Sequence, residues 1–157
     1  MRKYAPFFFC FFLVLLLVGC QSKEDTQKEQ VETEQPPLLF LAVSDVLIKK
    51  FAAHSYDWTY ETTTGQQKNI RQMDTLPPSK EVASMEEVKV KAFRYLKVGF
   101  DPMPIYYDVT LYDKEDREVA RYESIEEIKE RGSYVVKIDA QFKKGEALYY
   151  VPLHMMK

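Results

Sequence analysis

The chain has 157 residues, of which 46% are hydrophobic and 29% charged, and its formal net charge is −2. This length and balance predict one globular domain, or two at most, rather than a disordered chain. Because there is no strong basic excess to neutralise phosphates, we expect no nucleic-acid partner. The chain also has only two cysteines and two histidines, so we expect no metal and no cofactor.

Residues 1–19 have the pattern of a secretory signal. Arg2 and Lys3 give a positive start, and residues 5–18 carry no charge. A helix that crosses the hydrocarbon core needs about 20 apolar residues, so this shorter stretch favours a cleaved signal over a membrane anchor.

The end of the apolar stretch reads Leu17-Val18-Gly19-Cys20. These four residues resemble the lipobox of bacterial lipoproteins. The resemblance implies cleavage between Gly19 and Cys20 and a diacylglycerol on the sulfur of Cys20. It also implies a mature protein held by this lipid at the extracytoplasmic face of the cell membrane. Two acyl chains suffice for stable anchoring. The alternative is a buried cysteine at the end of a membrane helix.

Residues 20–37 are predicted to form a lipidated cysteine followed by a disordered linker. Residues 21–37 hold five acids and two bases, and Val31 is their only aliphatic residue. Such a segment buries too little surface to offset its ordering entropy. An isolated helix is the competing interpretation, but no apolar stripe gives it a face to pack. We expect a spacer.

Residues 38–157 form the expected folded domain. Its 18 basic and 19 acidic residues nearly cancel, and it contains no cysteine. Residues 133–142 alternate between apolar and polar, the pattern of a half-buried strand, and a turn at 143–146 predicts a hairpin with residues 147–156. Pro152 predicts an edge position or a shortened strand there. Further strands are expected at 38–43, 56–60, 68–72, 105–112 and 117–122, and from Val88 onward; residues 45–50 are expected to form a separate strand or a continuation of the first.

About seven or eight short strands predict an all-β, two-layer antiparallel sandwich. One short helix or turn is expected over 125–131, after the capping-box pattern Ser124-Ile-Glu-Glu127. The phrases Ser55-Tyr-Asp-Trp-Thr-Tyr60 and Gly132-Ser-Tyr-Val-Val136 are similar to those of small surface lipoproteins of Gram-positive bacteria. That resemblance implies an Ig-like sandwich at the cell surface.

Three aromatic residues, Tyr56, Trp58 and Tyr60, alternate along one strand and share a face. They are candidates for ligand binding by stacking, and packing in the sandwich core is the favoured alternative. The two histidines, His54 and His154, have no Gly-x-Ser-x-Gly motif to act with, and no carboxylate pair is evident, so no catalytic residues are expected.

The sequence therefore predicts a non-catalytic binding or structural module, lipid-anchored outside the cytoplasm. Its expected partners are the membrane, through Cys20, and an envelope protein or cell-wall polymer. The alternative is a tethered subunit or regulator of a membrane complex, which the anchor would keep at high effective concentration.

Overall fold

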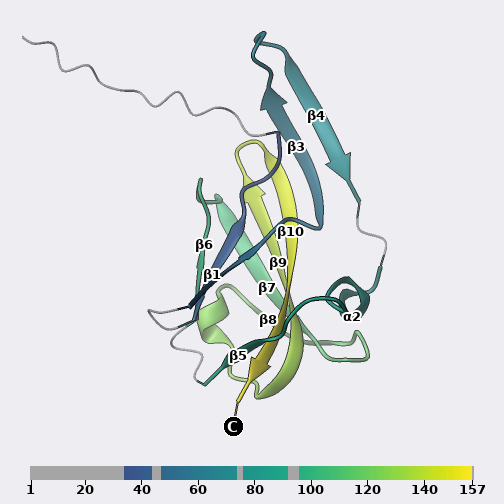
Figure 1. Ribbon diagram of the computed structural model, residues 1–157, viewed down its shortest axis with the longest axis vertical. Coiled ribbons are helices and arrows are strands. Elements are labelled where there is room, and N and C mark those ends of the chain that lie inside the picture. Colours follow the sequence, from purple (N-terminus) through teal and green to yellow (C-terminus); the bar gives the residue numbers. More distant parts are fainter. Residues whose placement is uncertain (1–33, 44–46, 74–75, 92–95, 157) are drawn as a thin grey trace, which may run out of the picture. The chain divides into compact units, whose positions relative to one another are not determined.

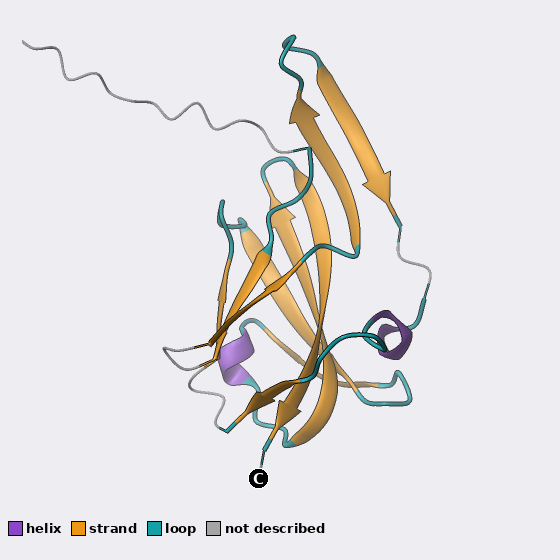
Figure 2. Ribbon diagram, viewed as in Figure 1, coloured by secondary structure: helices purple, strands orange, loops and turns teal. Residues whose placement is uncertain are grey.

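The computed structural model describes residues 34–43, 47–73, 76–91 and 96–156. Over these residues the protein is an all-β sandwich of two sheets, with helix confined to two very short segments (Figure 2). No helix among the described residues is long and apolar enough to cross a membrane. The predicted signal, the cleavage site at Gly19 and Cys20, and most of the linker lie outside the described residues.

The smaller sheet has three strands in the order β2-β1-β6, and all its pairs are antiparallel. The larger sheet has the order β4-β3-β10-β9-β7-β8, and a short strand, β5, pairs in parallel with the end of β10 (Figure 1). The strands are β1 (Leu39–Val43), β2 (Leu47–Phe51), β3 (Ser55–Glu61), β4 (Gln67–Gln72), β5 (Val88–Val90), β6 (Leu96–Gly99), β7 (Tyr106–Tyr112), β8 (Glu118–Tyr122), β9 (Gly132–Phe142) and β10 (Gly145–Met155).

The main core is built from alternate residues of the long strands. On β9, Val136 and Ile138 are fully buried, while Lys137 between them and Asp139 after them are only partly covered. The smaller sheet contributes Leu39 and Leu41, which alternate in the same way on β1 and belong to the same cluster. Because successive side chains of a strand point to opposite faces, one row of apolar residues per strand suffices to build this core.

The two-sheet sandwich predicted from the sequence is confirmed, but the strand count was too low. The described residues form ten strands rather than seven or eight. Strand β6 was missed because it has only four residues, of which Leu96 is buried and Val98 partly so. The predicted short helix is reduced to one 3₁₀ turn, Ile125–Glu127, where the side chain of Ser124 makes no capping bond. A second short helix, α2 (Pro78–Glu81), was not predicted.

Pro152 corrects the expectation about the last strand. Strand β10 runs unbroken for 11 residues, and β9 pairs with all of it. On its other side β10 pairs with β3 from Gly145 to Leu148 and with β5 from Leu153 to Met155. Pro152 falls in the gap between these two partners. Its missing N–H therefore removes no ladder hydrogen bond, and the proline does not shorten the strand.

The chain enters the domain through a buried pair of prolines. Pro36 and Pro37, assigned from the sequence to the linker, are both buried. The hydroxyl of Tyr149 donates a 2.6 Å hydrogen bond to the carbonyl oxygen of Pro37. Burial raises the pKa of Tyr149, because the ionised phenolate would lose its hydration. Packing against the domain thus begins at Pro36, two residues before the predicted boundary.

Candidate functional site

The outer face of the large sheet, opposite the core, is covered over only part of its area. The segment 76–87, which includes α2, crosses the half of this face near the end of β10. There Val82 packs against Val135 and Tyr150, and all three are buried. The Pro77-Pro78 start of α2 presets the backbone for a helical turn.

Two hydrogen bonds hold this cover segment to the sheet. The backbone N–H of Ser79 donates to Asp116 Oδ1 at 2.6 Å, and its hydroxyl donates to Asp116 Oδ2 at 2.7 Å. Asp116 sits in the β7–β8 turn with φ of 60°, a left-handed conformation that aspartate tolerates better than most residues. A single carboxylate thereby joins the cover segment to the hairpin below it.

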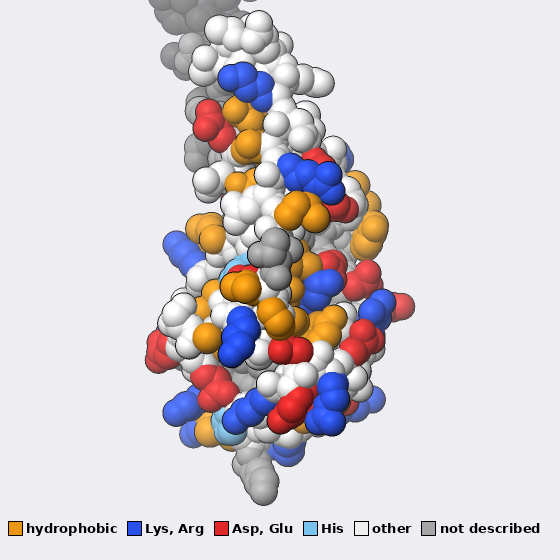
Figure 3. All heavy atoms as spheres, turned by 90° about the vertical axis from the view of Figure 1, so that its right-hand side faces the viewer, with side chains coloured by type: hydrophobic (Ala, Val, Ile, Leu, Met, Phe, Trp, Pro, Cys, Tyr) orange, Lys and Arg blue, Asp and Glu red, His pale blue; other side chains and the backbone are white. Residues whose placement is uncertain are grey.

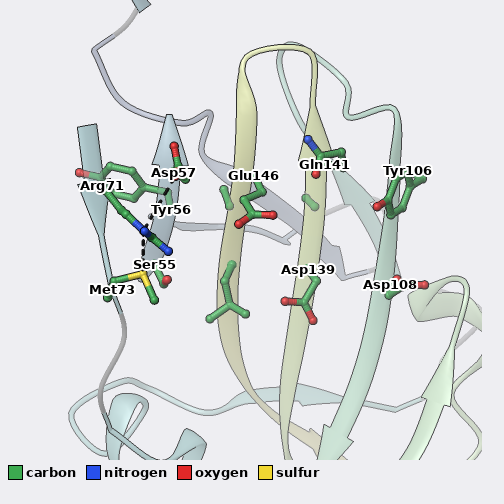
Figure 4. A pocket seen from close by; sticks show the side chains of 13 residues that line it. Ser55, Tyr56, Asp57, Arg71, Met73, Tyr106, Asp108, Asp139, Gln141 and Glu146 are labelled. Atoms are coloured by element: carbon green, nitrogen blue, oxygen red, sulfur yellow. Dashed lines mark hydrogen bonds and ion pairs between the residues drawn. The ribbon is translucent and has the colours of Figure 1, made fainter. Parts of the chain in front are cut away.

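The other half of the outer face is an open groove of about 250 Å³. In Figure 4 its side chains stand on five neighbouring strands, from β4 through β3, β10 and β9 to β7. Figure 3 shows the face of the molecule on the right-hand side of Figure 1. Apolar side chains lie in the middle of this face, with charged side chains of both signs around them. The groove is lined by Ser55, Tyr56, Asp57, Arg71, Met73, Tyr106, Asp108, Asp139, Ala140, Gln141, Glu146, Ala147 and Leu148.

The groove brings carboxylates into directly opposed pairs. Glu146 of β10 lies opposite Asp57 of β3, and Asp108 of β7 lies opposite Asp139 of β9. Like charges at directly opposed positions of an antiparallel pair destabilise the pairing. This arrangement makes the groove acidic on both sides of the central strands.

Only one member of each pair is compensated. Asn69 donates a 2.6 Å hydrogen bond to Asp57 Oδ1, and Arg71 lies 3.8 Å from its other oxygen. Lys137 lies 3.1 Å from Asp139. Within the described part of the chain, neither Asp108 nor Glu146 has an ion pair or a side-chain hydrogen bond, and both are exposed.

A close approach of two strands forms one wall of the groove. Gly145 begins β10 with φ of 147°, and a Cβ at this position would overlap the carbonyl oxygen of Asp57. Only glycine fits between the two backbones here. Beyond this point β3 continues past the start of β10, and β4 is its only partner among the described strands.

The structure separates the three aromatic candidates. Trp58 is only 2% exposed and lies in the core, with its ring 5.5 Å from that of Phe142 in an edge-to-face arrangement. Its indole therefore presents no face to a ligand. Tyr56 and Tyr60 are partly buried and pack against the same core cluster. Of the three residues, only Tyr56 lines the groove.

The two histidines lie in different surroundings. The ring of His54 makes an edge contact with that of Tyr150 at 5.2 Å. His154 Nδ1 lies 2.8 Å from the hydroxyl of Ser133, directly across the β9–β10 hairpin. No carboxylate among the described residues bonds to the ring of His154, so the pair lacks the third group that orients a catalytic histidine. No group of three or more potential metal ligands occurs in the described segments.

Sequence reasoning missed both the groove and the Ser133–His154 pair. The pair could have been found, because a hairpin centred on Lys143 and Lys144 places positions 133 and 154 opposite each other. The groove could not, because it requires β7 and β3 to flank the hairpin and the cover segment to stop halfway. No protein-family model, curated protein or solved structure matches the chain.

Proposed function

We propose that this chain is a lipid-anchored, extracytoplasmic binding protein without catalytic activity. In this proposal the open groove on the outer face of the large sheet receives a cationic segment of an envelope partner. One observation carries the proposal: Asp108 and Glu146 have no partner among the described residues, and they lie in a hollow that the cover segment leaves open.

The chemistry of the groove favours a peptide-like cation over a bare ion. Its base includes the partly buried side chain of Leu148, and Met73 and Tyr106 stand at its rim with 61% and 58% of their surface exposed. A lysine or arginine side chain combines an apolar stem with a charged end. Such a side chain would place its stem on this base and its charge between the opposed carboxylates.

The sequence supports the anchored location. The lipobox-like residues 17–20 precede an acidic spacer, and the packed domain begins at Pro36. Residues 21–35 would span about 20 Å as a flexible coil. The groove would then be held near the membrane surface, where a partner tethered to the same membrane meets it at high effective concentration.

Metabolic labelling with a radioactive fatty acid tests the anchor. The full chain should be labelled, and Cys20→Ala should remain unlabelled and at the size of the uncleaved chain. Cys10→Ala is the matched control, since it alters the other cysteine and should be labelled normally. Label retained by Cys20→Ala would refute the anchor.

Binding of a fluorescent hexalysine peptide to the full, detergent-solubilised lipoprotein tests the groove. The double variant Asp108→Asn/Glu146→Gln should bind roughly fivefold more weakly, as expected for the loss of two exposed ion pairs. The control Glu115→Gln/Glu118→Gln removes the same charge from the β7–β8 hairpin. Equal weakening by both double variants would show that only net charge matters.

Cross-linking from membranes distinguishes the two forms of the proposal. A single stoichiometric membrane protein, captured by the wild type and lost in Asp108→Asn/Glu146→Gln, identifies a tethered subunit. Capture of several cationic envelope components identifies a general binding module. Capture that is unaffected by the double variant argues against the groove as the binding surface.

A further inference from the structure

Apolar side chains are exposed at the end of the domain where the chain enters. Leu38, directly after the buried prolines, is 42% exposed, and Met103 and Ile105, in the connection from β6 to β7, are 65% and 63% exposed. We call these three residues the apolar tip. Large exposed apolar side chains gathered in one place usually mark a contact.

The strand register brings the parts of the tip together. Phe40 of β1 pairs with Gly99 of β6, so the chain leaves the two strands side by side at Leu38 and at the start of the 100–105 connection. Ile105 N donates a 2.7 Å hydrogen bond to the carbonyl oxygen of Gln141, one residue before β9 ends. Figure 1 shows the start of β1, the β6–β7 connection and the β9–β10 turn at the same end of the sandwich.

The surroundings of the tip suit a lipid headgroup layer. The β9–β10 turn beside it carries Lys143 and Lys144, whereas the 100–105 connection carries one acid, Asp101. A hollow beside the tip remains because β8 ends before this part of β7; Met103, Pro104, Ile105, Tyr106 and Tyr107 line its apolar part, and Asp108 and Glu123 line the rest. Tyrosine and lysine are favoured beside apolar residues at membrane interfaces.

The position of the proposed lipid anchor favours a membrane, rather than a protein, as the partner of the apolar tip. In the proposed function the spacer holds the entry end within about 20 Å of the bilayer. The opposite end is separated from it by the length of β9, about 35 Å for 11 residues. The turn at the end of the β3–β4 hairpin, which projects from the entry end in Figure 1, consists of Thr62, Thr63, Thr64, Gly65 and Gln66 and carries no charge to repel a membrane.

We propose that the apolar tip inserts into the outer headgroup layer of the membrane that carries the anchor, which fixes the orientation of the domain. This inference rests on the proposed lipid anchor. Docking by the tip alone would be weak, but an anchored domain needs little additional affinity.

The test uses one fluorophore on the full, lipidated chain in vesicles of phosphatidylethanolamine and phosphatidylglycerol that contain brominated lipid. Ile105→Cys and Ile48→Cys are matched labelling sites, because both isoleucines are 63% exposed and Ile48 lies toward the opposite end of β1. The domain has no other cysteine. We expect quenching at position 105 to be at least about twice that at position 48.

A second variant separates insertion from mere proximity. With the fluorophore at Met103→Cys, Ile105→Glu should lower the inserted fraction about tenfold, because it places a charge where insertion would bury an apolar side chain. Ile48→Glu should leave quenching at position 103 unchanged. Equal quenching at positions 105 and 48 in vesicle-bound protein would refute insertion of the apolar tip, but it would not refute the lipid anchor.

The remaining outcomes separate the two proposals. If the protein fails to float with the vesicles, both the lipid anchor and the insertion of the apolar tip are refuted. A photo-cross-linker at position 105 could capture a membrane protein in cells while brominated lipid does not quench the fluorophore. That result would identify a protein as the partner of the apolar tip and would refute its insertion into the membrane.

Discussion

The two halves of the outer face of the large sheet are built on the same strands but differ in the side chains that they present. In the covered half, Val135 of β9 and Tyr150 of β10 are buried under the cover segment. In the open half, the same strands present Asp139, Gln141 and Glu146. The inner face beneath both halves is uniformly apolar.

The comparison shows that apolar packing on the outer face of this sheet is confined to the covered half. Residues on the inner face form a continuous core, and the cover segment adds a second, smaller cluster on the outer face. The open half contributes no buried apolar residue of its own to that outer cluster and contains two opposed carboxylate pairs. Polar residues kept at some cost to strand pairing indicate selection for something other than stability.

The largest expected difference between the halves comes from matched tyrosines. Tyr150→Ala, in the covered half, should lower the free energy of unfolding by about 3 kcal/mol, because it leaves a cavity under the cover segment. Tyr106→Ala, 58% exposed in the open half, should cost under about 0.5 kcal/mol. Urea denaturation followed by the fluorescence of the single, buried Trp58 measures both. Similar losses would contradict the division into two halves.

The chain entry should be the next most sensitive position. Tyr149→Phe leaves the buried carbonyl of Pro37 without its hydrogen bond, which should lower the free energy of unfolding by about 2 kcal/mol. Burial raises the pKa of Tyr149 above the ordinary value of 10.0, so folding holds its proton more tightly. The stability of the wild type is therefore retained below pH 10 and falls as the pH rises above it. Tyr149→Phe should show a smaller alkaline loss, measured by denaturation across that pH range.

The cover segment should open locally when its attachment is weakened. Ser79→Ala removes the hydroxyl bond to Asp116, and we expect a cost of about 1 kcal/mol. Hydrogen exchange of the Val82 amide should report this opening, whereas amides of β9 should exchange as before. Ser84→Ala, an exposed serine of the same segment, is the control. Faster exchange throughout the domain would mean that the segment is not a separate unit.

The smallest effect is expected to have the opposite sign. Asp108→Asn relieves its repulsion with Asp139, which should raise the free energy of unfolding by about 0.5 kcal/mol at low salt and less at high salt. Asp113→Asn should instead destabilise the domain. The backbone N–H of Arg117, together with its guanidinium and the backbone N–H of Glu115, holds the pKa of Asp113 below its usual range. That contribution is present at neutral pH and disappears as the pH falls through the lowered pKa. If both Asp108→Asn and Asp113→Asn stabilised the domain, the contrast between a repelled Asp108 and a hydrogen-bonded Asp113 would be refuted.

Period-two alternation predicted the large sheet well. The faces expected for residues 133–142 are the ones observed, because Val136, Ile138, Ala140 and Phe142 all lie in the core. The same reasoning failed for Pro152, since the sequence of β10 does not show that two different neighbours leave a gap beside it. The groove was unpredictable for a related reason: it depends on contacts between residues as distant as Ser79 and Asp116.

The place where the chain enters also decides how the domain responds to mechanical force. Strand β1 lies between β2 and β6, and it pairs with both along its length. A pull transmitted through the residues before Pro36 runs along the axis of β1 and loads both ladders in shear, after first straining the bond from Tyr149 to Pro37. Many hydrogen bonds must then break together rather than one after another. A domain held at this strand, as the proposed lipid anchor would hold it, resists a pull better than one held at an edge strand, whose hydrogen bonds break one after another.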